Sequence, residues 1–184
     1  MTNQPPLAEL LRAATREQHQ QLDRHPLLRP LIQPGIRAEQ YSAALAALHG
    51  PTAELERQVE PLFQGQSGPG YSPRIRLLAQ DLARLHGQPR PYQGPLLKLH
   101  NPAQQIGGLY VLEGSRMGAF AIAQRLEQDL PDLPRDFFGN GGRRGWPDYW
   151  PPLLASLDPS QYPDAIQGAQ QAFEAFIQHL SACH

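Results

Sequence analysis

The chain has 184 residues, a formal net charge of −1 and one cysteine, Cys183. A near-neutral charge leaves no electrostatic footprint for nucleic acid, and a lone cysteine excludes an internal disulfide framework and paired-cysteine metal motifs. No apolar run approaches the roughly 20 residues of a membrane span, and the N-terminus has no apolar signal-peptide core. We therefore expect a single domain over residues 1–184, cytoplasmic and without membrane or nucleic-acid partners.

Apolar residues recur at helical spacing along most of the chain, with prolines and glycines between the repeats. We expect α-helices at about 7–24, 37–63, 72–86, 101–130 and 160–180, and a shorter helix inside 146–157. A kink or break should occur at Gly50-Pro51, and the proline-rich stretch 26–35 should be a connection. No segment of useful length alternates apolar and polar residues, so the sequence predicts an all-α fold.

The helix expected at 101–130 is unusual because it contains four interior glycines. Asn101 is a good N-cap and Pro102 suits the first helical position. Each interior glycine costs roughly 0.5–1 kcal/mol relative to alanine. Their spacing puts three of them on one face: Gly107, Gly114 and Gly118. Two interpretations stay open, namely close packing or a kink of this helix, and a helix laid across a planar ligand.

The first helix carries a candidate metal ligand. His19 is followed at i+4 by Asp23, so the carboxylate can reach the imidazole on the same helix face. A ligating histidine commonly donates its other ring N–H to such a partner. Arg12 lies two turns before His19, roughly 10 Å away at 1.5 Å per residue. The alternative is an exposed pair worth well under about 1 kcal/mol.

Two stretches together resemble the biliverdin-forming haem oxygenases. LRAATREQHQQLD, at 11–23, is similar to the proximal-helix motif, whose histidine is the axial haem ligand. GGLYVLEGSRMGAFAI, at 107–122, is similar to the distal helix, whose glycines let the backbone lie against haem. The motifs occur in the family's order, and the family's fold is helical. The GSxxGA form looks like the bacterial branch, which includes oxygenases that supply biliverdin to bacterial phytochromes.

On the proximal side, the resemblance implies that His19 is the axial iron ligand. It also implies that Asp23 accepts a hydrogen bond from that histidine, and that Arg12 contacts a haem propionate. The implied cofactor is haem, which is substrate as well.

On the distal side, the resemblance implies that Gly114 and Gly118 lie over the haem face. Tyr110 matches a haem-pocket position, and Arg125 is a candidate at the haem edge. Ser115 stands where animal members have an aspartate that holds the water network. Bacterial relatives share this serine, so the resemblance implies an active enzyme with a different proton route.

The implied activity is cleavage of haem to biliverdin, carbon monoxide and ferrous iron, with electrons from a ferredoxin or a reductase. The glycine face offers no distal histidine of the kind that peroxidases use. A non-catalytic haem carrier or sensor is the alternative that the sequence leaves open, because it would need the same residues. A di-iron bundle is excluded because no glutamate has a histidine three residues later.

Overall fold

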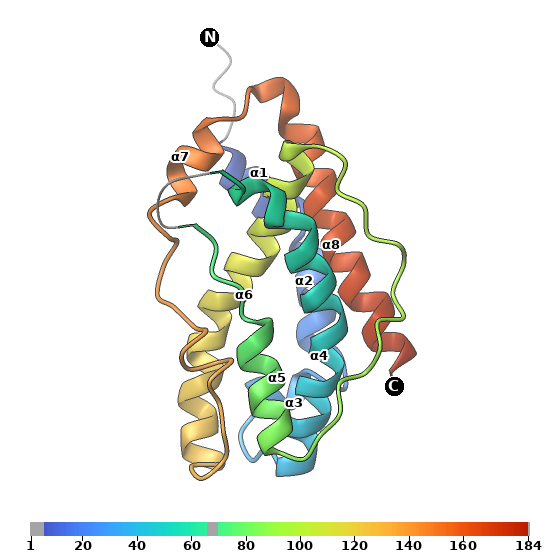
Figure 1. The fold of residues 1–184 in the computed structure, drawn as a ribbon, viewed down its shortest axis with the longest axis vertical. Helices are drawn as coiled ribbons and strands as arrows, with labels where there is room; N and C mark the ends of the chain where they lie inside the picture. Colours follow the sequence, from blue (N-terminus) through green and yellow to red (C-terminus); the bar gives the residue numbers. More distant parts are fainter. Residues whose placement is uncertain (1–5, 66–69, 184) are drawn as a thin grey trace.

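The computed structural model describes residues 6–65 and 70–183, which contain helices, turns and loops and no strand (Figure 1). The expected all-α fold is confirmed. The α-helices are α1 (Leu7–Ala14), α2 (Arg16–Arg24), α3 (Arg29–Ile32), α4 (Ala38–Val59), α5 (Ile75–Arg84), α6 (Pro102–Asp129), α7 (Trp150–Ala155) and α8 (Tyr162–Ala182). Two 3₁₀ helices are η1 (Glu60–Phe63) and η2 (Pro159–Gln161). No helix in this described part is both long and apolar enough to cross a bilayer.

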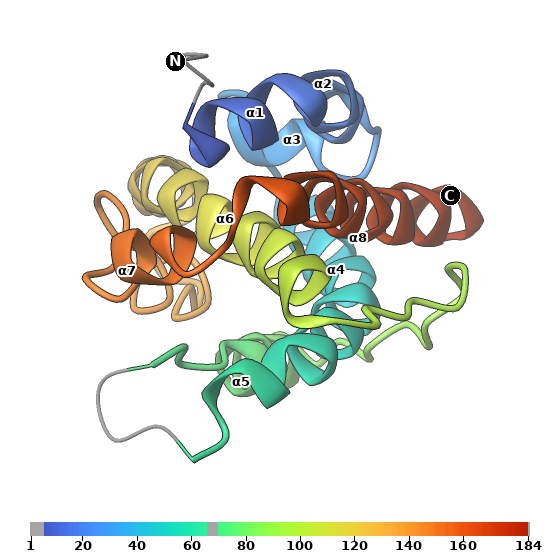
Figure 2. The same ribbon diagram turned by 90° about the horizontal axis from the view of Figure 1, so that it is seen from above.

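The helices form three layers, which are clearest from above (Figure 2). The long helices α6 and α8 make the middle layer, α1–α3 cover one side of it, and α4 and α5 cover the other. α6 and α8 approach each other where both lack side chains. A β-carbon on Gly107 would lie 1.9 Å from the Ala165 carbonyl oxygen, and one on Gly168 would lie 2.1 Å from the Gln104 carbonyl oxygen. Glycine is therefore required at this crossing.

The expected first helix is interrupted at Thr15, so it forms α1 and α2 in place of one continuous helix. The Thr15 hydroxyl donates to the Leu11 carbonyl at 2.7 Å, and its backbone leaves helical geometry at φ −111° and ψ 3°. Side-chain bonding of this kind competes with the backbone ladder and bends helices. The bend turns the His19 segment relative to the Arg12 segment.

Three other boundaries differ from expectation. The proline-rich connection contains the short helix α3, with Pro30 in its first turn. Gly50-Pro51 does not split α4, which runs through both residues before its last turn becomes η1. α5 begins at Ile75 rather than Ser72, because Glu56 of α4 accepts the backbone N–H groups of Arg74 and Ile75 at 2.7 and 3.2 Å. A carboxylate from a distant helix thus caps α5.

Candidate functional site

A cavity of about 850 Å³ lies between the α1–α2 segment and α6. Its volume is within the ~300–1,000 Å³ of small-molecule sites. α3, α4 and α8 supply much of its apolar lining. The eight candidate residues from the sequence all line it: Arg12, His19, Asp23, Tyr110, Gly114, Ser115, Gly118 and Arg125. The structure therefore brings together two motifs that are about 90 residues apart in the chain.

His19 lies on the α2 wall of this cavity. Its Nδ1 atom is 3.1 Å from Asp23 Oδ2, which leaves Nε2 as the ring nitrogen for a ligand. The side chains of His19 and Asp23 are 64% and 48% exposed. Phe173 of α8 supports the imidazole, with ring centroids 6.0 Å apart in an edge-on arrangement. Among the described residues no three His, Cys, Asp or Glu side chains gather to hold a bare metal ion.

The α6 wall opposite presents backbone to the cavity. A β-carbon built on Gly114 or Gly118 would meet nothing within 4 Å. Gly107 is different because it packs on the α8 backbone, as described above, and so does not belong to this wall. Of the two interpretations that the spacing left open, close helix packing applies to Gly107. For Gly114 and Gly118, helix packing is not the reason for glycine.

Arg74, just before α5, is a cavity residue that sequence reasoning missed. Its side chain is 2% exposed and lines the cavity. Nη2 donates to Ser115 Oγ and, at 3.4 Å, to the Leu112 carbonyl, while the guanidinium lies 4.8 Å from the centre of the Phe137 ring. Burial lowers the pKa of Arg74. Its Nε atom is buried and has no hydrogen-bond partner.

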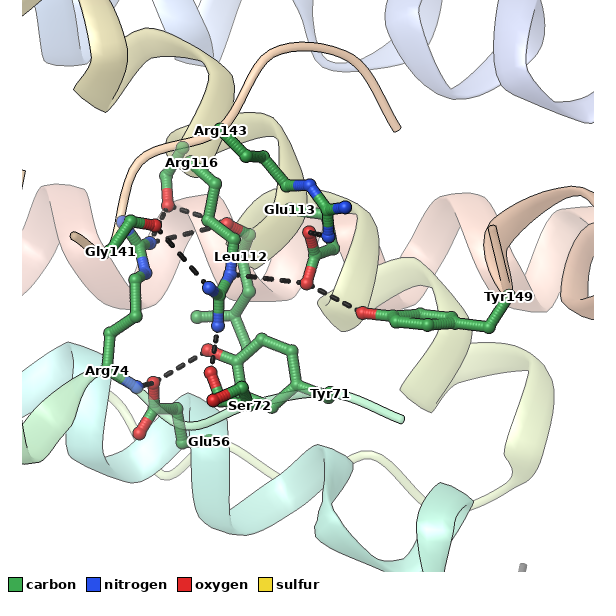
Figure 3. Close-up of polar contacts among 11 residues, drawn as sticks. Glu56, Tyr71, Ser72, Arg74, Leu112, Glu113, Arg116, Gly141, Arg143 and Tyr149 are labelled. Carbon is green, nitrogen blue, oxygen red and sulfur yellow. Dashed lines mark hydrogen bonds and ion pairs between the residues drawn. The ribbon is translucent and has the colours of Figure 1, made fainter. Parts of the chain in front are cut away.

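Behind the cavity, a buried polar cluster fixes the middle of α6 (Figure 3). Glu113, 1% exposed, accepts a hydrogen bond from the Tyr149 hydroxyl at 2.7 Å and lies 3.3 Å from Arg116 Nε. Arg116 also donates to the Ser72 carbonyl and, at 3.4 Å, to the Gly141 carbonyl. Burial raises the pKa of the Tyr149 hydroxyl, which keeps it a donor. These contacts hold α6 against the 141–149 segment and set the position of its glycine wall.

Comparison with known proteins identifies the family. A family model described as Heme oxygenase matches residues 5–182. The chain belongs to the haem oxygenase family. A protein named Heme oxygenase from Xanthomonas campestris pv. campestris is 31% identical over 163 residues, which is 85% of this chain and 98% of that protein.

Two solved haem oxygenase structures are also similar. The NO- and CO-bound haem oxygenase from Neisseria meningitidis has a TM-score of 0.69 and 25% identity, over 98% of this chain and 92% of that one. The haem-complexed haem oxygenase-1 of the cyanobacterium Synechocystis has a TM-score of 0.72 and 13% identity, over 97% and 92% of the two chains. The second likeness concerns the fold alone.

The family makes this haem oxygenase a haem-degrading oxidoreductase that uses an external electron donor, and haem is its substrate and cofactor. The cavity suits that group on its own chemistry. One wall offers a single imidazole, which is enough for an iron already held by a porphyrin. The other wall is free of side chains over Gly114 and Gly118, and guanidinium groups of Arg12 and Arg125 are available for carboxylates.

Proposed function

We propose that the cavity between α2 and α6 binds haem with His19 as the axial ligand and with Gly114 and Gly118 against the opposite face. The observation that carries this proposal is that a β-carbon at either glycine would meet nothing within 4 Å, although both glycines and His19 line one cavity. When bound, haem supplies the iron that binds oxygen and the porphyrin ring that is opened. The activity is oxidative cleavage of haem to biliverdin, carbon monoxide and ferrous iron.

Asp23 serves His19 rather than the stability of the fold. Both side chains are about half exposed or more, and an exposed pair of this kind contributes about 0–1 kcal/mol. By accepting the Nδ1 hydrogen, however, Asp23 fixes the tautomer that presents the Nε2 lone pair. The hydrogen bond also increases the basicity of the imidazole, which strengthens its bond to iron.

Arg12 and Arg125 are the proposed partners of the haem propionates. Arg12 is exposed on α1 and Arg125 is half-buried on the last turns of α6, and both line the cavity. A guanidinium binds carboxylates with two parallel hydrogen bonds, so it orients a planar ligand as well as holding it. Together they would fix the rotation of the porphyrin about the His19 axis, and hence which edge faces the oxygen.

Arg74 and Ser115 are the proposed replacement for the distal aspartate of animal members. The Ser115 hydroxyl donates to the Leu112 carbonyl at 2.7 Å and accepts from Arg74, so its hydrogen is committed to the backbone. The donors that remain belong to the Arg74 guanidinium. Because a guanidinium keeps its protons in proteins, Arg74 would act by orienting water in the cavity, and such water could supply the protons that haem cleavage requires.

His19→Ala tests the axial assignment. The haem-loaded wild-type protein with oxygen and a reductant should form biliverdin, and His19→Ala should lose this activity together with the spectrum of histidine ligation. His100→Ala is the matched control, because His100 is exposed and does not line the cavity. Biliverdin formation by His19→Ala at the wild-type rate would show that the axial assignment is wrong.

Arg74→Lys tests the distal assignment. The variant keeps the charge but loses the planar fork, so it should still bind haem, yield less biliverdin and release more hydrogen peroxide. Arg135→Lys is the control, since Arg135 is half-buried, does not line the cavity and takes no part in the polar cluster behind it. Equal peroxide release from the two variants would contradict a specific role of Arg74.

The partners follow from the resemblance to the bacterial branch. We propose that a ferredoxin or a reductase supplies the electrons, and that a bacterial phytochrome receives the biliverdin. Mixing the turning-over enzyme with phytochrome apoprotein tests the second partner: formation of the red-absorbing adduct supports it. Accumulation of free biliverdin beside unmodified apoprotein contradicts it.

A further inference from the structure

Both tryptophans of the chain lie in one aromatic stack beside the cavity. Trp146 and Trp150 are the only two tryptophans in the 184 residues. Their rings are stacked, with centroids 4.7 Å apart and planes 9° from parallel. Tyr110 of α6 continues the stack, 5.6 Å from Trp146 and 6.3 Å from Trp150. Each of the three rings thus lies close to both others, and the cluster reaches from the cavity wall into the core.

The two ends of this stack have different surroundings. Tyr110 and Trp146 line the cavity, whereas Trp150 does not and is only 2% exposed. Burial raises the pKa of the Tyr110 hydroxyl. The Trp150 Nε1 hydrogen is buried without a hydrogen-bond partner, although buried indoles usually find one. Stability alone would favour a partner there, or a phenylalanine.

Indole and phenol are the side chains that lose an electron most readily to a strong oxidant near them. Two nearly parallel indoles share the missing electron between their rings, which stabilises the oxidised pair. The Trp150 Nε1 hydrogen has no hydrogen-bond acceptor, so an oxidised Trp150 keeps its proton. An electron returned to it then restores tryptophan directly, without recovering a proton from elsewhere.

We propose that Tyr110, Trp146 and Trp150 form an electron-supply chain. They pass an electron to haem that hydrogen peroxide has oxidised, and the missing electron is then located at Trp150. The proposal rests on the proposed function, because it requires haem in this cavity. Hydrogen peroxide takes up two electrons and two protons as its O–O bond breaks, and gives two water molecules. The bound haem would supply both electrons and solvent the two protons. The indole pair then returns one electron, so one oxidising equivalent lies on the indole pair and one stays at the haem. A one-electron donor such as ascorbate, or the donor used in catalysis, later supplies two electrons, one to each.

The test treats the haem-loaded protein with hydrogen peroxide in the absence of reductant. Rapid freezing and electron paramagnetic resonance should reveal an indole radical, and peptide mass spectrometry should find oxygen added at Trp150. The haem-free protein given the same peroxide should leave Trp150 unmodified, because this side chain is buried from solvent. Equal oxidation of Trp150 with and without haem would overturn the proposal, as would oxidation confined to exposed side chains.

Trp150→Phe is the decisive variant, because it keeps an aromatic ring in the core and leaves the cavity lining unchanged. It should lose most of the indole radical signal, and its haem should be bleached severalfold faster by peroxide. Tyr162→Phe is the control, since Tyr162 is half-buried and lies outside the cavity lining. If peroxide bleaches the haem of Trp150→Phe at the same rate as the haem of Tyr162→Phe, the electron-supply chain is overturned.

One further measurement separates this inference from the proposed function. Biliverdin formation with oxygen and reductant is measured on the wild-type protein. If no biliverdin forms, the proposed function is overturned. If biliverdin forms normally but peroxide leaves Trp150 unmodified, only the electron-supply chain is overturned. If Trp150→Phe does not fold, Trp146→Phe replaces it, with the same expected loss of radical and the same outcome overturning the chain.

Discussion

The two halves of α6 contain glycines for different reasons. In the first half, a β-carbon on Gly107 would lie 1.9 Å from a backbone oxygen of α8, and one on Gly108 would lie 2.6 Å from the Leu99 side chain. In the second half, β-carbons on Gly114 and Gly118 would meet nothing within 4 Å. The first pair is glycine because protein fills the space, and the second because the space belongs to the cavity.

This difference teaches that spacing along a helix identifies a face but not what covers it. α8 crosses α6 beside Gly107 and has left it by Gly114, so one stripe of the helix meets backbone at one end and a cavity at the other. A glycine without a neighbour lowers helix stability, and no packing contact within the protein requires it. Such a position is therefore the stronger indication of a ligand. Substitutions at the two ends should separate the two reasons.

The largest effect should come from Gly118→Leu, which puts a bulky side chain into the space proposed for haem and oxygen. Leucine is a good helix former and should raise local helix propensity by roughly 0.8 kcal/mol, so the haem-free chain should stay folded. We expect the biliverdin yield per folded molecule to fall by about tenfold or more. A tenfold fall in rate corresponds to an activation barrier that is about 1.4 kcal/mol higher. A product assay alongside a folding assay measures both. Wild-type yield from this variant would mean that Gly118 does not face the reacting group.

Gly107→Ala should have the next largest effect, and on stability instead of chemistry. The added methyl would meet the Ala165 carbonyl, a backbone atom that cannot rotate away. Overpacking of this kind costs about 1–3 kcal/mol, or roughly 2–4 °C in melting temperature per kcal/mol for a chain of this size. Denaturant unfolding measures the loss, with the yield of biliverdin per folded molecule unchanged. Unchanged stability would contradict the tight α6–α8 crossing.

Gly114→Ala should have the smallest effect, with the opposite sign. Since nothing lies within 4 Å of the added methyl, replacing glycine should stabilise the haem-free chain by roughly 0.5–1 kcal/mol. The same variant should bind haem less tightly, because the methyl occupies the cavity wall. Denaturant unfolding measures the stability of the haem-free chain, and haem titration measures its affinity for haem. A destabilised haem-free variant would indicate an unrecognised neighbour at Gly114.

Local chemistry made much of the fold predictable. The N-cap of α6 is an example, since Asn101 accepts the Gln104 backbone N–H at 2.9 Å as its sequence position suggests. The helix type of each long segment followed from apolar spacing. The break at Thr15 was missed because a threonine in a helix only sometimes forms the competing bond to the turn before it, here to Leu11.

The site was predictable only where a motif carried it. All eight candidate residues line the cavity, and their individual roles stay predictions. Arg74 was not found, because its position depends on Glu56, 18 residues earlier and on another helix. No local pattern around Ser72 and Pro73 reveals that contact. The different surroundings of Gly107 and Gly114 are likewise set by α8, which lies far away in the sequence.

The rise in melting temperature on adding haem tests the central claim most directly. Haem binds the folded chain, so it should stabilise it by about 2.7 kcal/mol at a concentration 100 times the dissociation constant. Gly107→Ala should lower the melting temperatures of the haem-free and haem-bound forms alike and keep the wild-type rise. Gly118→Leu should keep the haem-free melting temperature and lose most of the rise. The reverse result, with Gly107→Ala losing the rise and Gly118→Leu keeping it, would contradict the assignment of the second half of α6 to the haem face.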